Sequence, residues 1–324
     1  MIVLKLLLLS AVVLLLLILL VTAWVLQPTF RRSQRWLSVR GDPVRLRQHV
    51  AALTSIPGGR SHLNGNGLAI AAAYIRTNFA ESGARVTEQV YNVGTATYTN
   101  VIASFGPETG DRIIVGAHYD TVLGTPGADD NASGVAGLLE LARALSGGMP
   151  PTRIDLVAYV LEEPPFFRTE QMGSYMHAKS LRDAKVKVRA MICLEMIGYY
   201  TDLPNSQEYP ISGVATIYGN RGDFIAVVGK MAKPALVRSV KRAMLAGGDL
   251  RIVSANAPGS IPGIDFSDHL NYWAFDYPAV MLTDTAFYRN PNYHATSDTH
   301  DTLDYQRMAK LVDQIESAVM YLAR

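Results

Sequence analysis

One segment near the N-terminus constrains the fold of this chain most strongly: the run Leu6–Leu26, in which only Ser10 and Thr22 are polar. A helix of that length, rising about 1.5 Å per residue, matches the hydrocarbon core of a bilayer, which is about 30 Å thick. Trp24 suits the interface at the end of such a helix. The sequence therefore predicts a transmembrane anchor over residues 1–27.

A cleaved signal peptide is the alternative to an anchor, because Val21, Thr22 and Ala23 resemble a cleavage site. The hydrophobic core of a signal peptide usually has about 7–15 residues, and this run is longer. We therefore expect a single-pass membrane protein that contacts the lipid bilayer through this helix. The arginines that follow the helix favour a cytoplasmic domain by the positive-inside rule, namely Arg31, Arg32, Arg35 and Arg40.

The overall composition is that of a folded protein, with 49% hydrophobic and 18% charged residues, which excludes a disordered chain. Because 30 Lys and Arg nearly balance 28 Asp and Glu, we expect no nucleic-acid partner. Cys193 is the only cysteine, so no intrachain disulfide can form. No repeat or long linker divides the rest of the chain, and we expect a juxtamembrane linker over 28–45 and one catalytic domain over 46–324.

Within that domain, apolar runs alternate with helical patterns, which is typical of an α/β fold. We expect strands over residues 101–105, 112–117, 154–161, 190–194, 215–218 and 278–282. We expect helices over residues 133–145, 223–245, 267–274 and 305–322. Pro234 should kink or break the second of these helices, and Ser267 should cap the third.

Histidine and carboxylate side chains directly follow three of the expected strands. His118 and Asp120 follow the first, Glu162 and Glu163 the second, and Glu195 the third. In an open α/β sheet the ligand crevice lies outside the carboxyl ends of the strands, so we expect these side chains to meet. Histidine and carboxylate form a ligand set that suits zinc. A bridging carboxylate between two zinc ions, with a second carboxylate as general base, would build a hydrolytic site.

Five short segments together resemble the co-catalytic (di-zinc) aminopeptidase family, which includes bacterial leucine-type aminopeptidases, glutamate carboxypeptidase-like ectodomains and, more distantly, glutaminyl cyclases. They are Gly-Ala-His-Tyr-Asp (116–120), Gly-Ala-Asp-Asp-Asn-Ala-Ser-Gly (127–134), Leu-Glu-Glu (161–163), Cys-Leu-Glu-Met-Ile-Gly (193–198) and Tyr-His-Ala-Thr-Ser-Asp-Thr (293–299). The resemblance runs from about Asn100 to the C-terminus. It implies an α/β fold with a mixed, mostly parallel central sheet flanked by helices, as in zinc exopeptidases.

By position, the resemblance implies two Zn²⁺ ions held by five side chains: His118, Asp130, Glu163, Glu195 and His294. His118 would bind one zinc, Glu163 and His294 the other, and Asp130 would bridge the two. Glu195 stands where the family usually has an aspartate that binds the first zinc, so its longer side chain requires the metal or the backbone to shift.

The same resemblance assigns catalytic roles to three further residues. Glu162 would be the general base on a water that bridges the metals, and Tyr293 would donate to the oxyanion. Asp120 would accept the second ring N–H of His118 and fix its tautomer. The inserted segment Pro164–Met172 would form an active-site wall.

Other residues remain between a functional and a structural interpretation. Asp268 is a candidate for a substrate loop or for helix capping. Several aromatic residues could line a specificity pocket or simply pack in the core: Phe166, Phe167, Tyr199, Tyr200, Phe287 and Tyr288. Asp129 is expected to be a surface or turn acid, and Asp298 to orient the segment after His294 or to cap a turn. Four histidines are expected to be structural or exposed: His49, His62, His177 and His300.

These observations predict a membrane-anchored zinc exopeptidase, specifically an aminopeptidase that acts on peptides. A glutaminyl-cyclase-like acyltransferase with a single zinc is the alternative. A non-catalytic ectodomain is disfavoured because all five ligand positions hold histidine or carboxylate. Related enzymes with one N-terminal hydrophobic segment usually act outside the cytoplasm, so we expect a periplasmic domain. The arginines that follow the helix predict the opposite orientation by the positive-inside rule. The preferred side chain, the choice between amino- and carboxypeptidase activity and the oligomeric state stay open.

Overall fold

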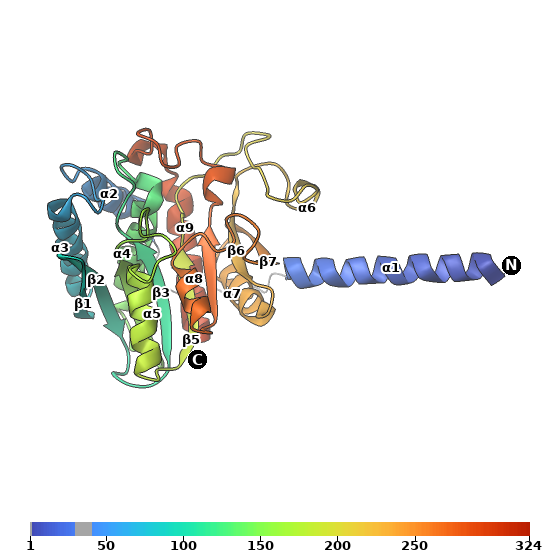
Figure 1. Cartoon of the computed structure of the whole chain (residues 1–324), viewed down its shortest axis with the longest axis horizontal. Helices are drawn as coiled ribbons and strands as arrows, with labels where there is room; N and C mark the ends of the chain where they lie inside the picture. The colour runs from blue at the N-terminus through green and yellow to red at the C-terminus, as the bar shows by residue number, and fades with distance from the viewer. Residues whose placement is uncertain (1, 30–40) are drawn as a thin grey trace.

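Eight strands form one central sheet in the order β1-β2-β4-β3-β5-β8-β6-β7 in the computed structural model, which describes residues 2–29 and 41–324 (Figure 1). The strands are β1 (Arg85–Val93), β2 (Ala96–Phe105), β3 (Arg112–His118), β4 (Arg153–Tyr159), β5 (Val188–Leu194), β6 (Phe224–Lys230), β7 (Arg251–Ala257) and β8 (Ala279–Thr283). Strands β4, β3, β5 and β8 run parallel to one another, whereas β1, β2 and the β6–β7 pair join through antiparallel contacts. The predicted mixed, mostly parallel sheet is therefore confirmed.

Helices cover both faces of this sheet. The helices are α1 (Ile2–Leu26), α2 (Pro43–Thr54), α3 (Gly65–Glu81), α4 (Gly134–Leu145), α5 (Gly173–Asp183), α6 (Ala215–Tyr218), α7 (Pro234–Gly247), α8 (His269–Ala274) and α9 (Tyr305–Leu322). Apolar side chains of α2, α3, α4, α7 and α9 share one buried cluster with one face of the strands, and α5 and α8 share a second cluster with the other face. The central strands are apolar on both faces because helices bury them from both sides.

Most expected elements are present, and two are wrong. Residues 215–218 form the short helix α6, whose Ile217 is exposed, rather than a strand. The expected helix over 223–245 is instead strand β6 followed by α7, and Pro234 occupies the first turn of α7, where a missing N–H costs nothing. Asp268, not Ser267, precedes the first residue of α8. Helices α2, α3 and α5 and strands β1 and β7 were not assigned from sequence.

Helix α1 extends away from the domain, and its last turn lies against β7 at the edge of the sheet (Figure 1). Asn256 donates to the carbonyl of Trp24 over 3.1 Å, and Ser254 donates to that of Leu26 over 2.6 Å. The ammonium of Lys241 donates to the carbonyl of Gln27 over 3.3 Å, a favourable place for a cation because carbonyls at a helix C-terminus are unpaired. These contacts fix the end of α1 on the domain.

The described residues contain one helix that is long and apolar enough to cross a membrane, namely α1. Helix α2 begins at Pro43, within the segment expected as the juxtamembrane linker. Residues 30–40 of the expected linker lie outside the described residues.

Acid should destabilise this domain through His177, which is buried on α5 with Nδ1 2.6 Å from the hydroxyl of Tyr272. Burial lowers the pKa of His177 from 6.5 to about 4. Below pH 6.5 the unfolded chain therefore binds a proton at His177 that the folded chain does not bind. As the pH falls from 6.5 to 4, the free energy of unfolding should decrease by about 3 kcal/mol. In metal-free protein, urea unfolding over this range should show a shallower pH dependence for His177→Gln than for wild type. An equal pH dependence of the unfolding free energy in the two proteins would show that His177 does not cause the loss of stability.

Candidate metal centre

The carboxyl ends of β3, β4 and β5 deliver the predicted side chains to one edge of the sheet. His118 is the last residue of β3, Glu162 and Glu163 follow β4, and Glu195 follows β5 directly. Asp130 comes from the turn Ala128–Ser133 that precedes α4, and His294 comes from the loop after β8. Leu161 and His294 both have positive φ, at 63° and 56°, in a left-handed region that concentrates at functional sites.

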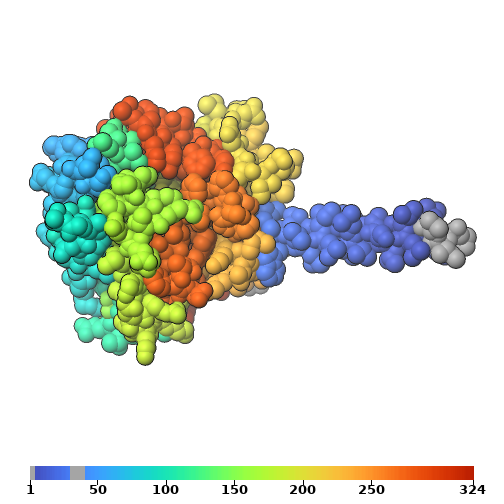
Figure 2. Space-filling model, viewed as in Figure 1, coloured from blue at the N-terminus to red at the C-terminus, as the bar shows by residue number. Residues whose placement is uncertain are grey.

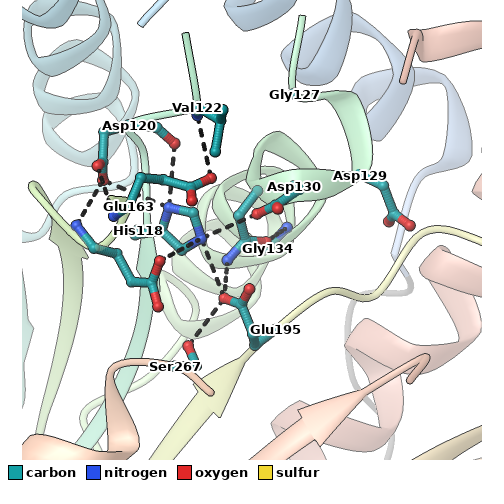
Figure 3. Close-up of polar contacts among 12 residues, drawn as sticks. His118, Asp120, Val122, Gly127, Asp129, Asp130, Gly134, Glu163, Glu195 and Ser267 are labelled. Atoms are coloured by element: carbon teal, nitrogen blue, oxygen red, sulfur yellow. Dashed lines mark hydrogen bonds and ion pairs between the residues drawn. The ribbon is translucent and has the colours of Figure 1, made fainter. Parts of the chain in front are cut away.

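Asp130 lies between the two histidines. Its Oδ1 is 3.2 Å from Nε2 of His118, and its Oδ2 is 3.1 Å from Nε2 of His294. Oε2 of Glu195 is 3.3 Å from the same atom of His118, and Oε2 of Glu163 is 3.4 Å from that of His294. Two groups of three candidate ligands, His118–Asp130–Glu195 and Asp130–Glu163–His294, thus share the carboxylate of Asp130, and Figure 3 draws the first of them.

The atoms at the centre of this arrangement fit a pair of cations. Nε2 of His118 and Oδ1 of Asp130 are buried and have no hydrogen-bond partner among the described residues. Buried polar atoms are nearly always paired, so two orphaned atoms that face each other point to a metal. Two imidazoles and three carboxylates are a ligand set that zinc accepts, and each carboxylate offers a negative charge to balance it.

Hydrogen bonds from outside the centre hold its side chains in place. Asp120 accepts from the backbone N–H groups of Glu162 and Glu163, both over 3.1 Å. Nδ1 of His118 lies 3.1 Å from the backbone carbonyl of Asp120 and 3.5 Å from its carboxylate. The main-chain oxygen, rather than the expected carboxylate, is therefore the nearer partner that fixes the ring.

Glu195 is held by two residues to which sequence reasoning gave no role at the centre. The side-chain amide of Asn131 donates to its Oε2 over 2.8 Å, and the hydroxyl of Ser267 donates to the same oxygen over 3.0 Å (Figure 3). Such partners orient ligands and raise metal affinity. The longer side chain of Glu195 is thus given a defined position against His118. Ser267 was expected to cap α8, and it instead faces the centre.

Asp129 lies in the turn Ala128–Ser133, one of its two expected places, but it is fully buried and not at the surface. Its carboxylate accepts from the N–H of Gly198 over 2.9 Å and from the amide of Asn290 over 2.7 Å. Asp298 accepts from the N–H groups of Asp129 and Asp130 over 2.9 and 3.1 Å, so it positions the shared carboxylate. The polar sequence of this turn gave no signal that tertiary contacts would bury it.

Arg60 is a residue that sequence reasoning missed. It is fully buried beneath the centre and donates to the backbone carbonyls of Tyr119 and Gly127 over 2.8 and 2.7 Å. Burial lowers its pKa to about 10, which still leaves it cationic at neutral pH, and the neighbouring Asp298 and Asp120 oppose the shift. A buried cation here offsets part of the negative charge of the carboxylates. No local pattern marks it, since its partners are main-chain atoms of distant segments.

Burial and mutual repulsion shift the pKa values of the carboxyl groups upward. Burial raises the pKa of Glu163 and of Glu195 to about 7, and it raises that of Glu162 well above its ordinary range. Burial alone would lower the pKa of His118, but Glu195, Asp120 and Asp130 raise it well above 6.5. So many acids in one buried place are costly unless cations neutralise them, which again favours metal.

The two adjacent glutamates differ in their surroundings. Glu163 accepts from the N–H of Val122 over 3.2 Å and contacts His294, which fixes its carboxylate. Oε2 of Glu162 is 4.0 Å from His118, and among the described residues its carboxylate accepts no hydrogen bond. Tyr293 stacks on His294 with ring centroids 3.8 Å apart. Burial and the surrounding carboxylates raise the pKa of Tyr293, so its hydroxyl keeps its proton.

The predicted substrate-binding residues are dispersed. Asp268 is fully buried, and neither carboxylate oxygen has a hydrogen-bond partner among the described residues. Phe166 packs against His62 and Tyr98. Phe167 packs on Phe266 with centroids 5.8 Å apart, while the N–H of Tyr199 donates to Asp284. None of these four lines the apolar cavity beside the centre, whereas Phe287 and Tyr288 do.

Comparison with known proteins identifies the family. The model of peptidase family M28 matches residues 100–319. The uncharacterized protein YfbL of Escherichia coli (strain K12) is 52% identical over 282 residues, which cover 85% of this chain and 86% of that protein. The chain belongs to peptidase family M28. This M28 membership identifies it as a hydrolase of the peptidase class and confirms the resemblance found in the sequence.

Proteins of lower identity are similar to this chain as well. Leucine aminopeptidase 1 of Coccidioides posadasii (strain C735) is 27% identical over 223 residues, which cover 64% of this chain but only 52% of the fungal protein. A zinc aminopeptidase from Bacillus subtilis aligns with a TM-score of 0.68 at 15% identity, over 86% of this chain and 94% of that one. A glutaminyl cyclase from Bacteroides thetaiotaomicron aligns with a TM-score of 0.65 at 18% identity, over 87% of this chain and 99% of the cyclase. These likenesses show the fold that this M28 chain shares with both kinds of enzyme.

Proposed function

We propose that this M28 protein is a membrane-anchored, zinc-dependent aminopeptidase with two metal ions. The observation that carries the proposal is the position of Asp130, whose two oxygens face His118 and His294 separately. One carboxylate shared by two histidine-containing groups is what a two-metal hydrolytic site requires. His118, Asp130 and Glu195 would hold one zinc, and Asp130, Glu163 and His294 the other.

Zinc bound there would polarise the scissile carbonyl and make water a stronger nucleophile near neutral pH. Glu162, which has no hydrogen-bond partner to compete, would take the proton of the attacking water as the new C–O bond forms. It would return that proton to the leaving nitrogen as the peptide C–N bond breaks. The protonated hydroxyl of Tyr293 would donate to the oxyanion. The carboxylates around the centre would attract the cationic α-amino group of a peptide.

We propose further that α1 spans the bilayer and keeps the domain, which begins near Pro43, at the periplasmic surface. In support, α1 is long and apolar enough to cross a membrane, and its last turn is hydrogen-bonded to Asn256, Ser254 and Lys241 of the domain.

The test of this function combines metal analysis with substrate choice, on the full chain in phospholipid nanodiscs. Chelation should abolish hydrolysis of leucyl 4-nitroanilide, and zinc should restore it at two ions per chain. The N-acetylated substrate should not be cleaved, because it lacks the amino group. One zinc per chain, together with cyclisation of glutaminyl peptides, would favour the glutaminyl-cyclase alternative; activity that survives chelation would contradict both.

A further inference from the structure

An apolar cavity connects the metal centre with the end of the membrane helix. It has a volume of about 150 Å³. Glu195 and Tyr293 line one end, and Val25 and Leu26 from the last turn of α1 line the other. The metal centre and the anchor, which lie at opposite ends of the sequence, therefore border one continuous space.

Side chains of the sheet, several of them small, form the floor of this cavity. Strands β8, β6 and β7 are neighbours, and Val228 pairs with Ala255 in the register of β6 and β7. Ala226, Ala255 and Ala257 all line the cavity, so three positions of one sheet face carry only a methyl group. Helices α7 and α9 pack on the opposite face of this region. Small residues here leave room that larger aliphatic side chains would fill.

Loops rather than a long helix cover this floor. The residues that close the cavity from above come from three loops, around Tyr209–Val214, Ile261–Ile264 and Thr285–Tyr288. They contribute Ile211, Ile264 and Phe287, so the cover is apolar like the floor. An apolar space of about 150 Å³ accepts an apolar ligand the size of a six-carbon ring.

The far end of this cavity lies on the side of the domain from which α1 leaves. Figures 1 and 2 show α6 and its flanking loop extending on that side, above the C-terminal end of α1, where this helix meets the domain. This loop exposes three large apolar side chains, since Leu203 is 69% exposed, Ile211 49% and Ile217 52%. Apolar groups beside a membrane helix can contact the lipid interface. The cavity would then open at the bilayer surface.

We propose that this cavity binds a long aliphatic chain on the N-terminal residue of the substrate, and that such amphipathic peptides enter it from the bilayer surface. The chain could be an apolar side chain or one attached to the residue by lipidation, and both present the same chemistry to the cavity. The proposal rests on the aminopeptidase function and on the anchor described above, and it adds the substrate class. The continuity of Glu195 and Tyr293 with Val25 and Leu26 carries it.

A homologous series of arylamides tests the proposal. The full chain in nanodiscs is given 2-aminoalkanoyl 4-nitroanilides with linear side chains of two to eight carbons, and S-hexadecyl-cysteinyl 4-nitroanilide. Because burial of each methylene is favourable, kcat/KM should rise about fourfold per added carbon beyond four carbons. A gain that ends within the series indicates an apolar side chain, and a gain that continues to the hexadecyl substrate indicates a lipidated residue. No gain beyond four carbons would overturn the proposal.

Matched variants separate the cavity from general effects. Ala255→Phe fills the floor, so the ratio of kcat/KM between eight and four carbons should fall close to one. Ala184→Phe makes the same change at an exposed position after α5 and should keep the wild-type ratio. If Ala255→Phe does not fold, Val214→Trp narrows the cavity from its half-buried loop position instead. A ratio that survives both cavity variants would contradict the proposal.

The experiment also distinguishes this proposal from the proposed function. Leucyl hydrolysis without a gain for longer chains overturns only the substrate class. If no arylamide is hydrolysed, the aminopeptidase function fails, and photocrosslinking decides whether the cavity binds the chain. A 2-aminoalkanamide with a terminal diazirine should then label α1 or the segment Tyr209–Val214. Labelling confined to residues that do not line the cavity would exclude binding there.

Discussion

Replacing the proposed general base by its amide, in Glu162→Gln, is expected to lower kcat about 1,000-fold while both zinc ions stay bound. The amide keeps the shape of the side chain but cannot accept a proton, and general-base catalysis typically contributes about 10²- to 10⁴-fold. Zinc should stay because the shared carboxylate of Asp130 and the fixed carboxylate of Glu163 are unchanged. Steady-state kinetics on leucyl 4-nitroanilide and zinc analysis of the same sample measure the two effects.

A control and a contrast make this result specific. Glu170→Gln, an exposed position in the loop after β4, should keep wild-type kcat and zinc content. Glu163→Gln should lose zinc as well as activity, because Glu163 contacts His294. A Glu162→Gln protein that keeps kcat within tenfold of wild type would exclude Glu162 as the base. If this variant lost one zinc instead, Glu162 would act as a ligand.

The residues that sequence placed best are those whose position depends on local structure. His118 and Glu195 each stand at the end of a short apolar strand, and parallel strands bring such ends to one edge whatever lies between them. The 3.3 Å between Nε2 of His118 and Oε2 of Glu195 follows from that arrangement, whereas Asp130 reaches them from the turn before α4. Glu163 and His294 come together across many intervening residues, and only the resemblance to a family placed them in one group.

Burial by distant segments explains what sequence could not predict. The sequence predicts a single helix over β6 and α7, because the strand β6 is buried on both faces and lacks the alternation of apolar and polar residues that marks a strand. Ile217 lies in a β-branched stretch of strand type, yet α6 projects into an exposed loop. Asp129 and Arg60 have polar neighbours in the sequence, and their burial depends on residues that are distant in the sequence.

Removing the shared carboxylate, in Asp130→Asn, should have the largest effect on metal binding. Oδ1 and Oδ2 of Asp130 face different histidines, so an amide, which offers one oxygen and no charge, weakens both metal sites at once. We expect zinc affinity to fall by more than the roughly 10- to 100-fold that loss of an outer partner costs. Loss of several kcal/mol of electrostatic stabilisation should lower kcat/KM by at least about 10⁴-fold.

The neighbouring Asp129 provides the matched control, because Asp129→Asn makes the same change one position away. Asp129 points away from His118 in Figure 3 and contacts Gly198 and Asn290 instead. Burial and the nearby Asp284 raise its pKa well above the ordinary range, so replacing this carboxyl group by an amide should cost less charge than the same change at Asp130. Titration with zinc should give two ions for Asp129→Asn and fewer than one for Asp130→Asn at equal metal concentration. Two tightly bound ions in Asp130→Asn would exclude a shared carboxylate, because neither site would then depend on it.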